Sequence, residues 1–292
     1  LIKEKNVQTM IIAIPTLNIT KRRLLVKRLK KYQIETKILP GIKDLMNDNI
    51  SINDIRSLNI DDLLEREINK SYEISNKLTE NKKILITGGG GSIGSELARQ
   101  IILLKPKEII LVDHSEYNLY KIKEDLEKIN NLSNNINEVQ VTCELLSINN
   151  YDGLKYLFER KSPNVIFHAA AYKHVNLVEI NIFEAIRNNF FGTLNVVKLS
   201  KAFNIEKFIL ISSDKAVRPT SIMGATKRLS ELIVHAYANG KDIENKSTTI
   251  FSTVRFGNVL ASSGSAIEKF YRQIKNRESI TVTHSEVTRY FM

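Results

Sequence analysis

The sequence predicts an α/β fold, with a doubly wound parallel sheet preceded by a partial α/β domain. Two observations carry this prediction. From residue 82 onward, short runs of apolar and β-branched residues recur, and a segment of helix length separates each run from the next. A glycine-rich turn stands directly after the first run. Strands that alternate with helices form a parallel sheet, whose ligands lie at the carboxyl ends of the strands.

The first part of the chain predicts one small β-α-β piece. Its expected elements are a strand at 10–14, a basic helix over 21–31 and a second strand at 37–39 that ends at Pro40 and Gly41. Two strands and a helix cannot enclose a core. We therefore expect residues 1–45 to be the C-terminal fragment of an auxiliary α/β domain whose beginning is absent.

The following residues, 46–80, are polar and punctuated by Asn and Asp. We expect them to be a linker arm that contains a short helix over 60–68. Residues 81–292 are expected to form the domain that contains the sheet. Its predicted strands are 82–87, 108–112, 139–142, 165–167, 207–211 and 249–256.

The charge of the chain favours an anionic partner. There are 43 Lys and Arg residues against 32 Asp and Glu residues, which gives a formal net charge of +11. This excess favours nucleic acid, acidic lipid headgroups or phosphorylated small molecules without choosing among them. The lysines are spread along the chain and accompany no motif that reads DNA or RNA, so we expect no nucleic-acid partner.

Cysteine content and hydropathy set further limits. Cys143 is the single cysteine, and no Cys/His cluster has metal-ligand spacing, so we expect neither an internal disulfide nor a metal site. The longest apolar run near the start, 10–14, is far shorter than the roughly 20 residues that cross a bilayer. The chain as given is expected to be soluble.

The glycine-rich turn predicts a dinucleotide site. Gly88, Gly91 and Gly94 stand at G-x-x-G-x-x-G spacing directly after Thr87, the last residue of the first strand of the sheet. This spacing allows a tight turn, brings backbone N–H groups close to a pyrophosphate, and lets the next helix pack near the strand. A plain flexible loop is the alternative, but here a strand precedes the turn and a helical pattern follows it.

The second strand of the sheet ends at Asp113, 25 positions after Gly88. An acid near this offset binds the hydroxyls of the adenosine ribose, and its charge repels a 2′-phosphate, which favours NAD over NADP. The alternative is that Asp113 caps the next helix, with Ser115 beside it.

Five segments, in this order, resemble those of one family. They are Thr87 to Gly94, His168-Ala-Ala-Ala171, Ser213-Asp214-Lys215, Met223-Gly-Ala-Thr-Lys227 and Arg255-Phe-Gly-Asn258. Together they resemble the extended short-chain dehydrogenase/reductase (Rossmann) family, and within it the large bacterial UDP-N-acetylglucosamine 4,6-dehydratases of capsule, O-antigen and protein-glycan synthesis. The resemblance covers residues 82–292, and residues 10–68 resemble the end of the auxiliary domain of those membrane-anchored proteins.

The resemblance implies an NAD-dependent enzyme, with NADP as the less favoured cofactor. The residues that it assigns to the cofactor are Thr87, Gly88, Gly91, Ser92, Ile93, Gly94, Asp113, His114, Ser115, Ala169, Ala170, Ala171 and Lys227. Ser147 stands where relatives usually carry an acidic residue that holds the adenine.

The implied reaction removes water from a UDP-linked N-acetylglucosamine. Oxidation at C4 makes the C5 proton acidic, elimination across C5 and C6 follows, and the stored hydride returns to C6. By resemblance, Lys215 is the base that takes the C5 proton and Asp214 is the acid that protonates the departing C6 hydroxyl. Ser213 is expected to bond the sugar 4-oxygen.

Met223 stands where most of the superfamily carries a tyrosine, four residues before the active-site lysine, which here is Lys227. A tyrosine there faces the same side of the helix as the lysine and can accept a proton, whereas methionine cannot. The large dehydratases that the chain resembles also carry methionine. We expect Lys227 to bind the nicotinamide ribose, and Asp214, ionised at the start, to take the 4-hydroxyl proton.

The resemblance also implies a UDP-sugar substrate. Its expected contacts are Lys173, His174, Asn189, Asn258 and, for the diphosphate, Arg289. The alternatives are a buried structural imidazole for His174 and a turn or cap role for Asn189. A homo-oligomer is expected, and the parent protein is expected at the cytoplasmic side of the bacterial inner membrane, attached through an N-terminal part absent here. The chain stops where relatives continue into more of the substrate-binding region.

Two rival functions use the same fold. A nucleotide-sugar 4-epimerase oxidises and reduces C4 but needs no C5 base, so the pair Asp214 and Lys215 argues against it. An inactive NAD-binding scaffold is the other rival, suggested by Met223 and by the expected truncation of the chain.

Overall fold

The computed structural model describes residues 5–14, 21, 24–25, 28–32, 34–38, 56–57, 78–132, 139–240, 248–259 and 266–282. The chain divides into two compact units, residues 1–73 and 74–292. The predicted helix over 60–68 lies outside the described residues.

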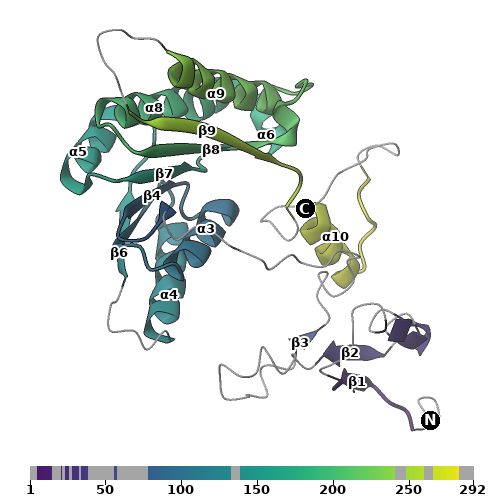
Figure 1. Ribbon diagram of the computed structural model, residues 1–292. Coiled ribbons are helices and arrows are strands. Elements are labelled where there is room, and N and C mark those ends of the chain that lie inside the picture. The colour runs from purple at the N-terminus through teal and green to yellow at the C-terminus, as the bar shows by residue number, and fades with distance from the viewer. Residues whose placement is uncertain are drawn as a thin grey trace. The chain divides into compact units, whose positions relative to one another are not determined.

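The first unit contains a three-stranded sheet (Figure 1). Strand β1 (Thr9–Ile12) pairs in parallel with β2 (Glu35–Ile38), and β2 pairs antiparallel with the short β3 (Arg56–Ser57). A 3-10 turn, η1 (Lys30–Tyr32), precedes β2. Ile12 of β1 and Leu29, which lies in the helical residues that follow β1, are buried in one apolar cluster.

The second unit contains the doubly wound parallel sheet, and the predicted fold class is confirmed. The strand order is β6-β5-β4-β7-β8-β9, and all neighbouring strands are parallel. The strands are β4 (Lys83–Thr87), β5 (Glu108–Asp113), β6 (Gln140–Leu145), β7 (Val165–His168), β8 (Lys207–Ser213) and β9 (Ile250–Phe256).

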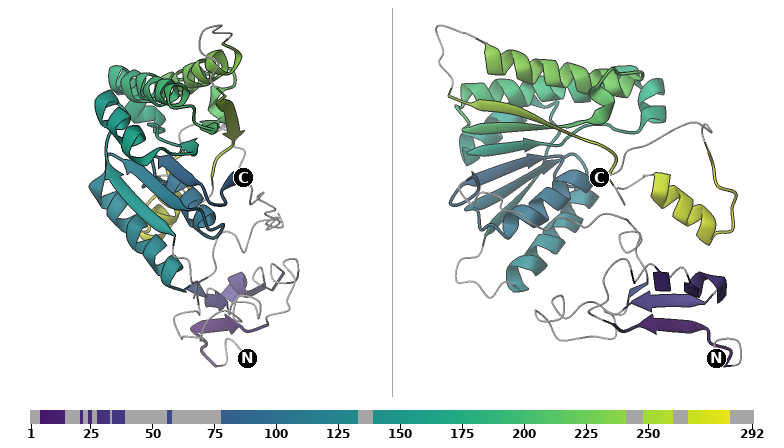
Figure 2. Two further views of the ribbon diagram at one scale, coloured as in Figure 1. Left: turned by 60° about the vertical axis from the view of Figure 1, so that its left-hand side comes forward. Right: turned by 45° about the vertical axis from the view of Figure 1, so that its right-hand side comes forward.

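Helices connect these strands and cover both faces of the sheet (Figure 2). They are α3 (Ser92–Ile102), α4 (Glu116–Leu132), α5 (Tyr151–Lys161), α6 (Val175–Ile180), α7 (Ile182–Ala185), the π-helical segment η5 (Ile186–Gly192), α8 (Thr193–Ala202), the 3-10 turn η6 (Asp214–Ala216) and α9 (Ile222–Asn239). A further helix, α10 (Ala266–Lys275), follows the last strand. In the described part of the chain, no helix combines the length and the apolar character needed to span a bilayer.

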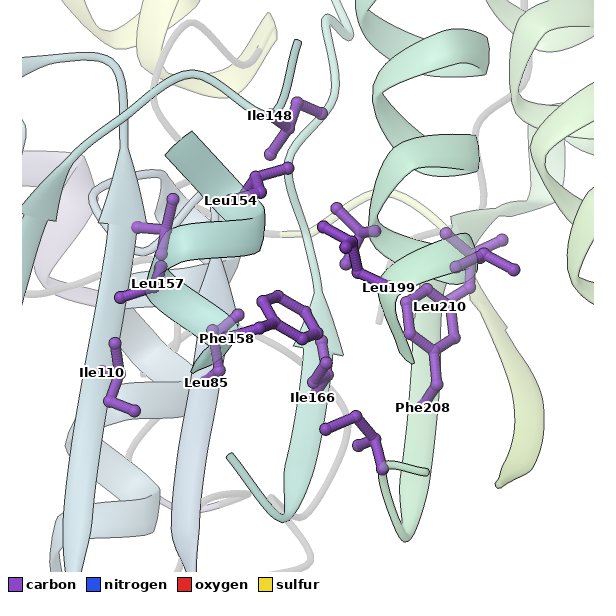
Figure 3. Close-up of a cluster of buried hydrophobic side chains, with 14 of the residues drawn as sticks. Leu85, Ile110, Ile148, Leu154, Leu157, Phe158, Ile166, Leu199, Phe208 and Leu210 are labelled. Atoms are coloured by element: carbon purple, nitrogen blue, oxygen red, sulfur yellow. The ribbon is translucent and has the colours of Figure 1, made fainter. Parts of the chain in front are cut away.

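Two apolar cores lie on opposite faces of the sheet, because side chains alternate along each strand. Ile84 and Ile86 of β4 face a core with α3 and α4, whereas Leu85 faces a core with α5, α8 and α9. Figure 3 shows the second core, where Phe158 and Phe208 are fully buried. Each large apolar side chain buried in this way contributes about 1.5–3 kcal/mol of transfer free energy. These two cores hold the strands in place, and they thereby set the position of the edge at which the strands end.

Candidate active site

The glycine-rich turn joins β4 to α3 at the carboxyl edge of the sheet. The Gly91 N–H bonds to the Gly88 carbonyl oxygen at 3.0 Å, and the Gly89 N–H bonds to the Val112 carbonyl oxygen at 3.1 Å. Gly91 occupies the N-cap of α3, and the first turn of the helix receives no hydrogen bond from a capping side chain. Because the N–H groups of a helix N-terminus attract negative charge, this turn suits a phosphate group.

Glycine is required at two positions of this turn. Gly88 has φ +66°, and a Cβ atom added there would come within 2.8 Å of the Ala170 backbone. A Cβ atom added at Gly94 would come within 2.1 Å of the Gly88 carbonyl oxygen. The turn therefore packs against both the next helix and the segment after β7, and this close approach fits a dinucleotide cradle.

The carboxylate of Asp113 holds the same turn from β5. Its Oδ2 accepts from the Gly90 N–H at 3.0 Å, and its Oδ1 accepts from the Ser115 N–H at 3.0 Å. Capping of α4 falls to Ser115, whose Oγ accepts from the Asn118 N–H at 3.4 Å. Asp113 therefore shapes the loop through the backbone, and contact with a ribose stays a prediction.

A cleft of about 680 Å³ opens over the turn, a volume typical of a ligand site. It is lined by Gly88, Gly90, Gly91, Ser92, Ile93, Gly94, His114, Asn118, Ala169, Ala171, Tyr172, Lys173, His174, Leu177, Val178, Asn181, Glu184 and Ala185. A smaller recess of about 160 Å³ shares several of these residues and adds Asp113, Ser147, Ala170 and Asn188. The structure thus gathers most of the predicted cofactor residues, together with Lys173 and His174, around one continuous surface.

Several cleft residues were not predicted. Asn118, Leu177, Asn181 and Glu184 lie on or between helices, in segments that no motif marks. Only the packing of those helices against the sheet brings them to the cleft. Thr87 and Ser115, in contrast, were predicted and line neither the cleft nor the recess.

A second group of polar residues lies at the end of β8. The Ser213 Oγ donates to Asp214 Oδ1 at 2.9 Å, and the Lys215 Nζ donates to the same oxygen at 3.0 Å. Lys215 Nζ also donates to Asn258 Oδ1 at 2.9 Å. The hydroxyl of Ser213 and the amine of Lys215 therefore both contact the carboxylate of Asp214, one strand away from the cleft-lining segment after β7.

Hydrogen bonds keep Asp214 ionised. Partial burial acts to raise the pKa of this carboxyl group, but the hydrogen bonds from Lys215 and Ser213 outweigh it and hold the pKa below its usual value. Asp214 can therefore begin a reaction as a proton acceptor.

Met223 and Lys227 stand one turn apart on α9. The Lys227 Nζ donates to the Ile211 carbonyl oxygen at 2.7 Å, and burial lowers the pKa of this amine to about 8. Met223 is 3% exposed and packs against Val178 and Ala185, which line the cleft. Helix α9 therefore supports the cleft, and Met223 lies behind the part of the wall that Val178 and Ala185 form.

The other predicted substrate residues have different environments. Burial lowers the pKa of Lys173, which lies in the cleft. Asn189 is fully buried, and its amide bonds the backbone N–H and carbonyl of Tyr172 at 2.8 and 3.1 Å, so it holds a wall of the cleft. Arg289 lies outside the described residues. Within the described ranges, His, Cys, Asp and Glu side chains form no group of three that could hold a metal ion.

Residues 84–292 match a protein family described as "Polysaccharide biosynthesis protein". The capsular polysaccharide biosynthesis protein CapD of Staphylococcus aureus is 41% identical over an alignment that covers 100% of this chain and 47% of that protein. A UDP-glucose 4-epimerase of Rickettsia bellii is 32% identical over 73% of this chain and 59% of that protein. The chain spans about half the length of the curated relatives that match it over its full length.

Solved structures share the fold. The X-ray structure of Pen from Bacillus thuringiensis has a TM-score of 0.66 and 36% identity, and the match covers 73% of this chain and 63% of that one. A UDP-glucuronic acid 4-epimerase from Bacillus cereus, solved in complex with UDP-glucuronic acid and NAD, has a TM-score of 0.58 and 21% identity. That match covers 72% of this chain and 68% of the other, and at this identity it establishes the architecture alone.

Proposed function

Since the chain belongs to the polysaccharide biosynthesis protein family, we propose that it is a nucleotide-sugar 4,6-dehydratase acting on UDP-N-acetylglucosamine. One observation carries the proposal. At the end of β8, Lys215 Nζ lies 3.0 Å from Asp214 Oδ1. The neighbouring strand is β7, and the segment after β7 lines the dinucleotide cleft. Elimination of water needs an acid and a base at one place, and this pair supplies both.

The glycine cradle fits NAD. The turn at Gly88 and Gly94 leaves no room for a Cβ atom, which is the packing that a pyrophosphate-binding turn requires. These glycines, the Asp113 carboxylate and Lys227 are the residues that would hold the cofactor. When bound, NAD would supply a hydride acceptor for C4 and later a hydride donor for C6.

The proton transfers follow from the charges at β8. Asp214, ionised through its bonds to Lys215 and Ser213, takes the proton of the 4-hydroxyl group. Lys215, whose side chain is 31% exposed, first releases its ammonium proton to solvent and then, as the free amine, takes the C5 proton. Asp214 passes its proton to the departing C6 hydroxyl, which leaves as water. Lys215 then returns a proton to C5, so the net change is the loss of one water.

A nucleotide-sugar 4-epimerase is the second candidate, because a relative named UDP-glucose 4-epimerase is 32% identical over 73% of this chain. It would oxidise and reduce C4 and leave the mass of the sugar unchanged. An inactive NAD-binding scaffold is the third, and it would bind the cofactor without altering the sugar.

Mass spectrometry separates these functions. The chain is incubated with NAD and UDP-N-acetylglucosamine, and we expect the sugar nucleotide to lose one water. In heavy water, deuterium should enter at C5, and Asp214→Asn should suppress both changes. Lys198→Ala, which alters an exposed residue of α8, serves as the matched control. An epimerised product of unchanged mass would overturn the proposal in favour of the second candidate.

For the whole protein, we extend the proposal to a homo-oligomer at the cytoplasmic side of the bacterial inner membrane. Equilibrium sedimentation and membrane fractionation of the full-length protein test these two points.

A further inference from the structure

A series of buried hydrogen bonds runs from the glycine-rich turn to helix α9. It begins at Thr87, the residue before Gly88, whose Oγ1 lies 2.6 Å from His168 Nδ1. His168 Nε2 lies 2.9 Å from Thr193 Oγ1, and Thr193 Oγ1 donates to the Asn189 carbonyl oxygen at 2.6 Å. All four residues are at most 1% exposed. None of them has a part in the proton transfers at β8.

The chain of bonds continues into α9. The Ser230 Oγ donates to the same Asn189 carbonyl oxygen at 2.7 Å. The Asn189 side-chain amide donates to Thr226 Oγ1 at 3.0 Å and binds both backbone groups of Tyr172. Thr226 and Ser230 flank Lys227 on the helix. Strand β4, strand β7, the π-helical segment and α9 are therefore joined through one set of partners.

The partners fix the direction of the bonds that run from Thr87 through His168 and Thr193 to Asn189. A carbonyl oxygen only accepts, so the Thr193 hydroxyl must donate to Asn189 and can only accept from His168. His168 Nε2 therefore carries a hydrogen. Burial, helped by the charge of Lys227, lowers the pKa of His168 to about 3, so the ring is neutral near pH 7 and its Nδ1 must accept from Thr87.

From this geometry we propose that His168, as the Nε2–H tautomer, is a positioning residue that locks the start of the cofactor turn to the helix carrying Lys227. The Thr87 hydroxyl, the imidazole and the Thr193 hydroxyl act as one unit, because each donor has one acceptor and a break at any link leaves a buried polar atom unpaired. The inference rests on the proposed function only for the identity of the dinucleotide.

The tautomer is tested directly by nuclear magnetic resonance. The protein has five histidines, and with ¹⁵N-labelled histidine the signals of His168 are assigned by their absence in His168→Gln. At neutral pH we expect a protonated Nε2 and an unprotonated Nδ1. An Nδ1–H tautomer, or a doubly protonated ring, would overturn the inference whatever ligand the protein binds.

A double-mutant cycle tests whether the hydrogen-bond relay from Thr87 through His168 to Thr193 acts as a unit. Thr87→Val and Thr193→Val are each expected to weaken NAD binding by about tenfold, because each leaves a buried partner unsatisfied. Since both variants break one relay, the double variant should be much less than a hundredfold weaker. Calorimetric titration measures the affinities for NAD. Denaturant unfolding of the same four proteins without ligand gives a second cycle, in the free energy of unfolding.

The control cycle keeps Thr87→Val and uses Thr142→Val in place of Thr193→Val. Thr142 of β6 donates to Glu108 at 2.6 Å, two strands away from β4 and with no hydrogen-bond partner in common with Thr87, so the effects of Thr87→Val and Thr142→Val should combine independently. Independent effects in the Thr87 and Thr193 cycle as well would overturn the relay. If the wild type bound no dinucleotide, the proposed function would fail, while the unfolding cycle and the tautomer would still decide the relay.

Discussion

The two halves of the sheet build their parts of the site by different means. At β4 and β5 the site is made of backbone, with glycines in contact with neighbouring main chain and Asp113 bound to two backbone N–H groups. At β8 and α9 it is made of charged side chains, among them Asp214, Lys215 and the buried Lys227. The half at β4 and β5 therefore determines the shape of the site, and the half at β8 and α9 determines its charge.

This difference teaches how each half should fail. An added methyl group should damage the backbone half, because nothing there can move aside, and the loss should be in cofactor affinity. A removed charge should damage the side-chain half while the fold is kept. The loss should be in rate at the proton-transfer residues and in cofactor affinity at Lys227. Four substitutions test this contrast, beginning with the largest expected effect.

Lys215→Ala should lower turnover by about a thousandfold, because the group that takes the C5 proton is removed. The reduced cofactor and a 4-keto sugar that still holds its C6 hydroxyl should accumulate. Absorbance of the reduced nicotinamide and mass spectrometry measure both, with Lys198→Ala as the control. Full turnover in the Lys215 variant would remove this residue from the mechanism.

Gly94→Ala should weaken NAD binding on the order of tenfold to a hundredfold, because overpacking of this kind costs roughly 1–3 kcal/mol. The new Cβ atom would lie 2.1 Å from the Gly88 carbonyl oxygen, so the turn must shift. Calorimetric titration measures the affinity. Gly240→Ala, beyond the end of α9, is the control and should bind NAD as the wild type does. Equal affinity in both variants would contradict the shape argument.

Lys227→Met should stabilise the fold at pH 7 by about 1 kcal/mol while it weakens NAD binding. The pKa of Lys227 in the folded protein is about 8, below the ordinary value of 10.5. Below pH 8 the wild type keeps the full cost of burying a charge. Between pH 8 and about 10.5 the folded state releases a proton that the unfolded state retains, so the stability of the wild type rises with pH.

Denaturant unfolding from pH 7 to 10 measures this difference between Lys227→Met and the wild type. The gap should close and then reverse in sign by pH 10, since the wild type gains about 1.4 kcal/mol per pH unit above pH 8 whereas methionine does not titrate. A gap that stays constant over this range would show that Lys227 carries no buried charge at pH 7.

Met223→Leu should have the smallest effect, a loss of turnover of no more than about threefold and of stability below about 1.5 kcal/mol, because the swap conserves volume. Met223 packs in an apolar cluster and has no group that could accept a proton. Steady-state rates and thermal unfolding measure the two quantities. A rate loss as large as that of Lys215→Ala would show that the sulfur takes part in the reaction.

Much of the fold could be predicted from local patterns. The predicted strand at 82–87 is observed as Lys83–Thr87, and the one at 207–211 continues to Ser213, because its ladder with β9 extends to Phe256. The π-helical segment Ile186–Gly192 has no signal in the sequence. Its Asn189 faces the interior and holds Tyr172, which only the packing of α9 against this segment reveals.

By itself, the sequence determined the alternation of strands and helices, the glycine turn, and the placing of Asp214 and Lys215 at a strand end, because apolar periodicity and steric limits on the backbone act over a few residues. Tertiary structure alone decided which side chains meet. Lys215 contacts Asn258 across 43 positions and Thr87 contacts His168 across 81, and such pairs form only when parallel strands bring distant ends to one edge.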